Sequence, residues 1–221
     1  MAVIHHTTMH PTKLELLSEW LPTRAWYTDG TDRPRPAKAG GFRLDDPAGE
    51  VGIEFMAVTE GTGPDAVAHL VPMTYRGAPL EGAEQALIGT SEHGVLGTRW
   101  IYDGTHDPVF AAQLYALLTG QVVAQHQSLD DTPDDAVTVT PAAPGTGAEV
   151  ELVHVVDGPD HTDVVVREAG APAPVTLRVC RVLRPGSDAG ADPGLVATEW
   201  RLPDGSTVRG ACTVLLADTD R

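Results

Sequence analysis

The chain has 221 residues, 31 of them acidic and 15 basic, so its formal charge at neutral pH is -16. A surface this negative repels phosphate groups, which argues against nucleic-acid partners and against binding to anionic lipid. The hydrophobic fraction of 42% is sufficient for a globular core, but aromatic residues make up only 5%. We therefore expect a core built mainly from aliphatic side chains.

The sequence shows no basic segment followed by a long apolar run near its start, and no stretch approaches the roughly 18 apolar residues of a membrane span. These features predict a cytoplasmic protein without a membrane partner. Cys180 and Cys212 both lie in apolar, strand-like runs, so we expect them to behave as small buried hydrophobic residues and not as zinc ligands.

Three histidines lie close together near the start of the sequence, at positions 5, 6 and 10. If residues 2–8 form a strand, as their composition suggests, His5 and His6 point to opposite faces and cannot share one ion. We therefore predict no metal site here.

The next segment has helical periodicity. Pro11 fits the first turn of a helix, where a missing N–H is tolerated. The expected apolar face consists of Leu14, Leu16, Leu17, Trp20 and Leu21. We expect this helix to end at Pro22, followed by a surface loop over residues 28–36, which are rich in Asp, Gly, Arg and Pro.

Three strands are predicted next, over residues 41–44, 51–58 and 67–76, and they suggest an antiparallel meander. In the second strand, alternate apolar residues indicate one buried face and one solvated face. The residues of the expected buried face are Val51, Ile53, Phe55 and Ala57.

Residues 81–88 predict a short helix and residues 99–102 a short strand. A second helix should follow, because Asp107 can accept from its free N–H groups, Pro108 suits its first position, and Gly120 stands where it should stop. Its buried stripe is expected to be Phe110, Leu114, Leu117 and Leu118.

Residues 128–148 are rich in Asp, Pro, Gly and Ala around a short strand at 137–140, and they predict a loose hinge. All later segments predict strands, at residues 150–156, 163–167, 175–183, 195–202 and 208–216. The turn at residues 203–206 should join the last two as a hairpin. The expected fold class is α+β, a curved antiparallel sheet with packed helices followed by a mostly antiparallel β unit.

Side chains suited to ligand binding concentrate between the third predicted strand and the second main helix. Aromatic rings stack on sugars, and Asp, Glu and Arg supply planar hydrogen bonding. The candidate ligand-binding residues are Tyr75, Arg76, Glu92, His93, Arg99, Trp100, Tyr102, Asp103, His106 and Asp107. For most of these residues we favour a structural role in capping, turns and core packing, and for Tyr75 and Arg76 the end of a strand is an equally good explanation.

Sequence patterns of common active sites are absent. There is no GxxxxGK[ST] phosphate loop, no GxSxG nucleophile elbow and no HExxH zinc motif. We therefore assign no catalytic residue, no metal ligand and no cofactor.

Several ordered blocks of the sequence resemble the N-terminal cap of bacterial maltokinases over roughly residues 1–120. The blocks are Lys13–Leu17 with Trp20–Leu21 and Trp26–Tyr27, Pro72–Arg76, Ile88–Thr90, Trp100–Gly104 and His106–Pro108. Maltokinases make maltose 1-phosphate from maltose and ATP in α-glucan synthesis. In them the cap precedes a bilobal kinase, whose large C-terminal lobe carries the catalytic and metal-binding aspartates.

The resemblance implies a cap-like domain at residues 1–127, a hinge at 128–148 and a β-rich unit at 149–221, which could be a remnant of a kinase N-lobe sheet. The chain departs from a kinase in three ways. It ends at Arg221, it has no HxDxxxxN-like or DFG-like motif, and it has no lysine after Lys38 to hold a phosphate. Arg178 or Arg181 is a poor substitute for that lysine, because a guanidinium is not a compact ammonium.

The sequence therefore predicts a non-catalytic, stand-alone cap-like protein in α-glucan or trehalose–maltose metabolism. Its partner would be a sugar, an α-glucan or an enzyme of the same pathway. The alternative is an enzyme of α-glucan or sugar-phosphate metabolism that uses Asp103, His106 and their neighbours in an unfamiliar way.

Overall fold

A computed structural model of the protein describes residues 9–27, 35–62, 66–127, 132–143, 145–188 and 192–216. The strand expected at residues 2–8, with His5 and His6, lies outside these ranges, as does most of the loop expected at residues 28–36. The described helical elements are α1 (Lys13–Trp20), η1 (Leu21–Thr23), η3 (Glu84–Ala86), η4 (Gly104–His106) and α2 (Pro108–Leu118). The described strands are β1 (Met9–His10), β2 (Ala37–Leu44), β3 (Gly52–Glu60), β4 (Val67–Arg76), β5 (Leu87–His93), β6 (Gly97–Asp103), β7 (Gln125–His126), β8 (Thr138–Thr140), β9 (Val150–Asp157), β10 (His161–Glu168), β11 (Val175–Cys180), β12 (Val182–Leu183), β13 (Leu195–Arg201) and β14 (Thr207–Leu216).

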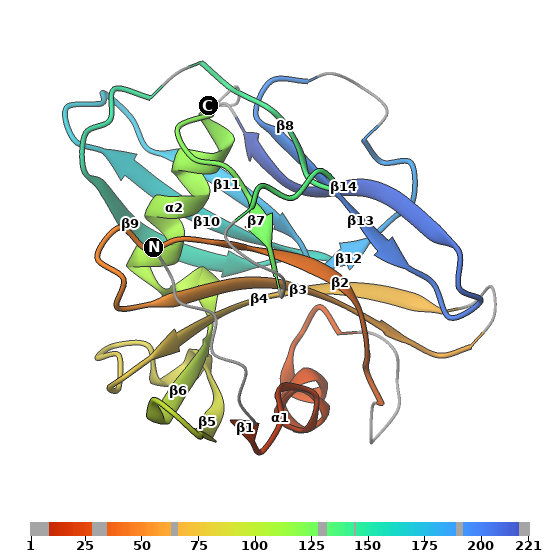
Figure 1. Ribbon diagram of the computed structural model, residues 1–221. Helices are drawn as coiled ribbons and strands as arrows, with labels where there is room; N and C mark the ends of the chain where they lie inside the picture. Colours follow the sequence, from red (N-terminus) through yellow and green to blue (C-terminus); the bar gives the residue numbers. More distant parts are fainter. Residues whose placement is uncertain are drawn as a thin grey trace.

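The described strands belong to one antiparallel sheet in the order β1-β5-β6-β4-β3-β2-β13-β14-β11-β10-β9 (Figure 1). Strands account for 47% of the described residues and helical turns for 15%, with only two short α-helices. The expected α+β class with packed helices is therefore wrong, and the fold is mostly antiparallel β. The error arose because the segment expected to add a helix before β6 extends the sheet instead.

The sheet closes on itself through the short strand β12. After β11 has paired with β14, the chain continues through Arg181 into β12, which pairs with the start of β4: Val182 lies opposite His69, and Leu183 opposite Ala68. The far half of β4 pairs with β6. Residues late in the sequence are thus hydrogen bonded to a strand from the first half.

Each α-helix covers a different face of β3 and β4, and Figure 1 shows α1 and α2 on opposite sides of these strands. The larger core contains Phe42, Phe55 and the α2 stripe predicted from the sequence, all fully buried. The smaller core contains Leu17, Trp20, Leu21, Trp26 and the opposite face of β3. The prediction of a half-buried strand at residues 51–58 is therefore wrong, because Met56 and Val58 are buried as well as Phe55.

The starts of the two helices show how local sequence decides an element boundary. Asp107 caps α2 by accepting from the N–H of Val109 at 2.9 Å, and Gly120 has φ +74° just beyond the helix, as predicted. In α1, however, Thr12 is the N-cap and Glu15 accepts back from its N–H at 2.7 Å, which makes a capping box. Pro11 therefore precedes the helix and does not occupy its first turn.

The segment at residues 81–88 is not the predicted helix. It forms only the single turn η3, after which Leu87 begins the strand β5. In β5, Ile88 and Ser91 are buried while Thr90 and Glu92 are exposed. The pairing of this strand with β6 satisfies the backbone groups that a helix would have paired internally.

The predicted strands at residues 150–156, 163–167, 195–202 and 208–216 are confirmed, and the turn at residues 203–206 joins β13 to β14. The strand predicted at 175–183 is instead two strands, β11 and β12, which are separated by Arg181 and pair with different neighbours. The predicted strand at 137–140 is β8, which pairs with β13. The division into a cap-like unit at residues 1–127, a hinge at 128–148 and a β-rich unit at 149–221 stays a prediction. Within the described residues, no helix combines the length and apolar character needed to cross a bilayer.

Two consecutive glycines let β2 approach its neighbours closely. A Cβ on Gly40 would lie 3.0 Å from the carbonyl oxygen of Glu199, near the point where β2 pairs with β13. A Cβ on Gly41 would lie 2.0 Å from the carbonyl oxygen of Phe55, and its φ of +131° is a conformation that other residues rarely adopt.

We predict that Gly41→Ala lowers the free energy of unfolding by about 3 kcal/mol, because backbone strain and a backbone clash act together. Gly49→Ala is the matched control, since Gly49 has φ +71° and open space around its missing Cβ. It should cost only about 1 kcal/mol. Urea unfolding measures both values, and equal losses would contradict the clash.

Burial raises the pKa of Cys180 to about 11, although the nearby Arg178 opposes this effect. Little thiolate is therefore present at neutral pH, and we predict slow alkylation of folded Cys180 at pH 7, accelerating as the pH approaches about 11. Because the pKa of this thiol is higher in the folded than in the unfolded protein, the thiol of the unfolded chain ionises first as the pH rises. We therefore expect the free energy of unfolding to fall above pH 9. Mass spectrometry after iodoacetamide treatment, with urea-unfolded protein as control, would measure this; rapid labelling at pH 7 would contradict the burial.

Candidate functional site

The start of α2 is fixed by an ion pair with the end of β4. Arg76 donates from Nε and Nη2 to the two carboxylate oxygens of Asp107, both at 2.6 Å. The Asp107 side chain is completely buried, whereas that of Arg76 is 20% exposed. The hydrogen bonds to Asp107 raise the pKa of Arg76. Asp107 thus holds a helix cap and a bidentate salt bridge at the same time.

A second ion pair joins the end of β6 to the residue between β11 and β12. Arg181 donates from Nη2 to Oδ2 of Asp103 at 2.5 Å and to Thr105 at 3.1 Å. The other oxygen of Asp103 accepts from the N–H and hydroxyl of Thr105 at 3.2 and 2.9 Å. The side chains of Arg181 and Asp103 are 0% and 4% exposed, so this charge pair lies in the interior.

The surroundings of Arg181 explain how a full charge is kept there. Its Nε donates to Thr162 at 2.8 Å, and its guanidinium lies over the ring of Trp26 at 4.8 Å from the centroid. Among the described residues, Nη1 has no hydrogen-bond partner. One carboxylate, two hydroxyls and an aromatic face thus take the place of water around this buried guanidinium.

The aromatic candidates of β6 pack under the turn that precedes β5. Tyr102 is 2% exposed, and its hydroxyl accepts from the N–H of Leu80 at 2.9 Å. Trp100 is half-buried and packs with Tyr102 against Ala83 and Ala86. In this arrangement both rings contribute to packing.

Tyr75 lies on the opposite face of β4 from Arg76 and contacts a buried carboxylate that the sequence analysis missed. Glu54, 6% exposed, accepts two hydrogen bonds from Nζ of Lys13, at 2.6 and 2.9 Å. The Tyr75 hydroxyl and the Gln127 amide also donate to it. Burial, followed by the charge of Glu54, raises the pKa of Tyr75. An acidic residue inside the apolar run 51–58 was the signal that could have identified this site.

Three further candidates lie at the exposed end of the β5–β6 hairpin. Thr98 donates to Glu92 at 2.7 Å, the ring of His93 accepts from the N–H of Leu96 at 3.1 Å, and Arg99 donates to the Leu96 carbonyl at 2.7 Å. Arg99 is four positions before Asp103 in β6, and Glu92 and His93 lie opposite Thr98 and Gly97. At about 3.3 Å per residue, the backbone of this group is therefore roughly 13 to 20 Å from that of Asp103.

The structure therefore distributes the ten candidates over separate places. Arg76, Asp107 and the half-buried His106 meet at the start of α2, close in sequence to Asp103. Tyr75 lies on the other face of the sheet, and Glu92, His93 and Arg99 lie at the hairpin end. Among the described residues, no three His, Cys, Asp or Glu side chains are placed to hold a metal ion.

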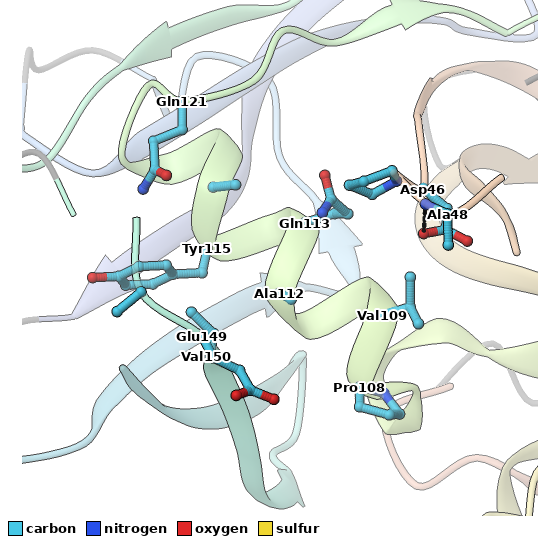
Figure 2. Close-up of a pocket in the computed structure, with 13 residues that line it drawn as sticks. Asp46, Ala48, Pro108, Val109, Ala112, Gln113, Tyr115, Gln121, Glu149 and Val150 are labelled. Carbon is cyan, nitrogen blue, oxygen red and sulfur yellow. Dashed lines mark hydrogen bonds between the residues drawn. The ribbon is translucent and has the colours of Figure 1, made fainter. Parts of the chain in front are cut away.

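A groove lies along the outer side of α2, and none of the ten candidates lines it (Figure 2). One wall is formed by Asp46, Pro47 and Ala48, and the other by residues 148–150. Between them α2 presents small apolar side chains such as Ala112. Asp46 is occupied structurally, since it accepts from three backbone N–H groups of the turn that follows it.

We predict that Arg181→Met lowers the free energy of unfolding by about 3 to 5 kcal/mol, because it leaves Asp103 buried without a counter-charge. Adding Asp103→Asn should cost less than the sum of the two single changes by at least about 1 kcal/mol. The control is Arg184→Met, which breaks an exposed pair with Asp160 and should cost less than about 1 kcal/mol. Additive losses in urea unfolding would contradict the coupling.

The family model of the maltokinase N-terminal cap domain matches residues 20–107. The matched segment runs from the last residue of α1, through β2 to β6, to the cap of α2. It includes all ten candidate residues, among them both partners of the Arg76–Asp107 pair, but of the Arg181–Asp103 pair it includes only Asp103. Over residues 20–107, therefore, the chain resembles the N-terminal cap domain of maltokinases.

Proposed function

We propose that this maltokinase-related protein acts in α-glucan or trehalose–maltose metabolism as a cap-like binding or regulatory partner, without catalysing a reaction itself. Its partner would be a sugar, an α-glucan or an enzyme of that pathway. The observation that carries the proposal is the match of residues 20–107 to the maltokinase cap, since in maltokinases the cap accompanies a kinase and does not contain the catalytic residues.

The bonding of the acidic candidates supports a binding role over a catalytic one. A general acid or base must reach the proton that it transfers. Asp103 and Asp107 are 3% and 0% exposed, and each is engaged by an arginine and by a backbone N–H group. Both carboxylates are therefore used in holding η4 and α2 in place.

The residues at the end of the β5–β6 hairpin are better placed to contact a partner. Glu92 is exposed and His93 and Arg99 are partly exposed, and the neighbouring Val95 and Leu96 are 62% and 44% exposed. Polar groups beside exposed apolar side chains are a common composition for a recognition surface. We include this end of the hairpin in the proposed binding surface.

We predict binding without turnover. Titration calorimetry against maltose, trehalose and glycogen, with pull-downs using a maltokinase and a branching enzyme, should give a complex with at least one of them. The double variant Glu92→Gln, Arg99→Ala should weaken that complex about tenfold, because it removes exposed hydrogen-bonding groups. Glu81→Gln, a change at an exposed residue before η3, is the control and should bind normally.

Two results would contradict the proposal. Absence of binding in all of these assays would remove the binding role. Turnover of a sugar or sugar phosphate by the purified protein would favour the alternative enzyme, and loss of that turnover in Asp103→Asn or His106→Ala would place the reaction at the start of α2.

A further inference from the structure

The strand β9 forms one edge of the sheet. It pairs with β10 on one side, and no described strand pairs with it on the other. Its backbone therefore presents N–H and C=O groups that another strand can use. By contrast, β12, β7 and β8 each add hydrogen bonds elsewhere along the sheet.

The side chains of β9 are unusually exposed for a strand. Val153 and Val156 are 41% and 53% exposed, and Glu151, His154 and Asp157 are also exposed. Many proteins protect such an edge with lysine or proline, and β9 contains neither. Its one irregularity is a bulge at Val153, since Leu152 lies opposite Val166 and His154 opposite Val165.

The groove along α2 begins where this strand begins. Glu149 and Val150 line the groove, and Val150 is also the first residue of β9. Figure 2 shows Glu149 and Val150 beside the helix, on the far side of the groove from Asp46 and Ala48. An extended segment paired with β9 would therefore reach a hollow in which small apolar residues such as Ala112 and Ala116 lie beside Gln113 and Tyr115.

The formally charged residues of this surface are all acidic. The groove lining and β9 together contain Asp46, Glu149, Glu151 and Asp157 but no lysine or arginine. The nearest basic residue on the neighbouring strand is Arg167, which lies opposite Glu151. A net charge of -16 also makes a second copy of the chain a poor occupant, because two acidic edges would repel each other.

We propose that β9 is a docking edge for an extended, basic strand of a partner protein. The partner strand would pair in β-sheet fashion with β9, lay its basic side chains beside Glu149 and Glu151, and place small apolar side chains at the mouth of the α2 groove. Backbone hydrogen bonds would supply affinity, and the groove and its charge would supply selectivity. This rests on the proposed partner-binding function and adds to it a second surface, separate from the end of the β5–β6 hairpin.

The probe is the acetylated and amidated peptide Thr-Lys-Val-Arg-Val-Lys-Val-Thr, added to the full chain. Hydrogen exchange followed by NMR should show new protection of backbone amides in β9, and binding should weaken as salt increases. A peptide with glutamate at the three basic positions should not bind, nor should one with proline replacing the central valine. Protection confined to other strands, or none in β9, would overturn the proposal.

The variant Glu149→Lys, Glu151→Lys should weaken peptide binding about tenfold while leaving the melting temperature nearly unchanged, since both side chains are exposed. Its control, Glu19→Lys, Glu81→Lys, makes the same change in net charge at exposed residues of α1 and of the turn before η3. Equal weakening by both variants would show that net charge, and not β9, controls binding.

The same variants separate this proposal from the proposed function. If a maltokinase or branching enzyme binds the protein and the β9 variant binds it equally well, the docking edge is wrong and the partner role stands. If the peptide protects β9 but no pathway enzyme or saccharide binds, the edge stands and the partner role fails. Concentration-dependent self-association that the β9 variant changes would assign the edge to a second copy and overturn the basic partner.

Discussion

The contact between Arg181 and Asp103 joins the two halves of the chain at the point where the sheet closes. Arg181 stands between β11 and β12, and its backbone accepts from the N–H of Leu70 on β4 while its side chain reaches Asp103 at the end of β6. Removing either charge would leave the other unpaired in the interior, which costs far more than losing an exposed pair. The family match contains the aspartate but not the arginine, so the cap-like segment is completed here by residues outside it.

Other buried carboxylates that could in principle take part in acid–base chemistry also have structural roles. Asp107 has to cap α2, and a buried carboxylate needs a second partner, which Arg76 provides. Glu54 accepts hydrogen bonds from Lys13, Tyr75 and Gln127, which come from three parts of the chain. In each case a charge fixes the position of a helix or strand, and the demand for internal hydrogen bonds limits what that charge can do for a ligand.

Local signals predicted those elements whose formation depends on neighbouring residues. Capping and hydrophobic periodicity act over a few positions. They therefore predicted the cap at Asp107, the buried stripe through Phe110 and Leu114, and the strand segments after residue 149. The pairing of β12 with β4 could not be read, since it joins residues more than 100 positions apart. The ten candidates were chosen by proximity in sequence, but strand geometry separates Glu92 from Asp103 and puts Tyr75 and Arg76 on opposite faces.

Closure also determines which parts of the sheet are left open to partners. Among the described residues, the main path of the sheet ends at β1 and at β9, and each of these two strands has a partner on one side of that path. The β1 end is only two residues long. β9 has eight residues, half-exposed valines and an acidic flank beside the α2 groove. The internal charges hold the fold together, and the two surfaces that we propose for recognition, the end of the β5–β6 hairpin and the β9 edge, lie at its periphery and differ in composition.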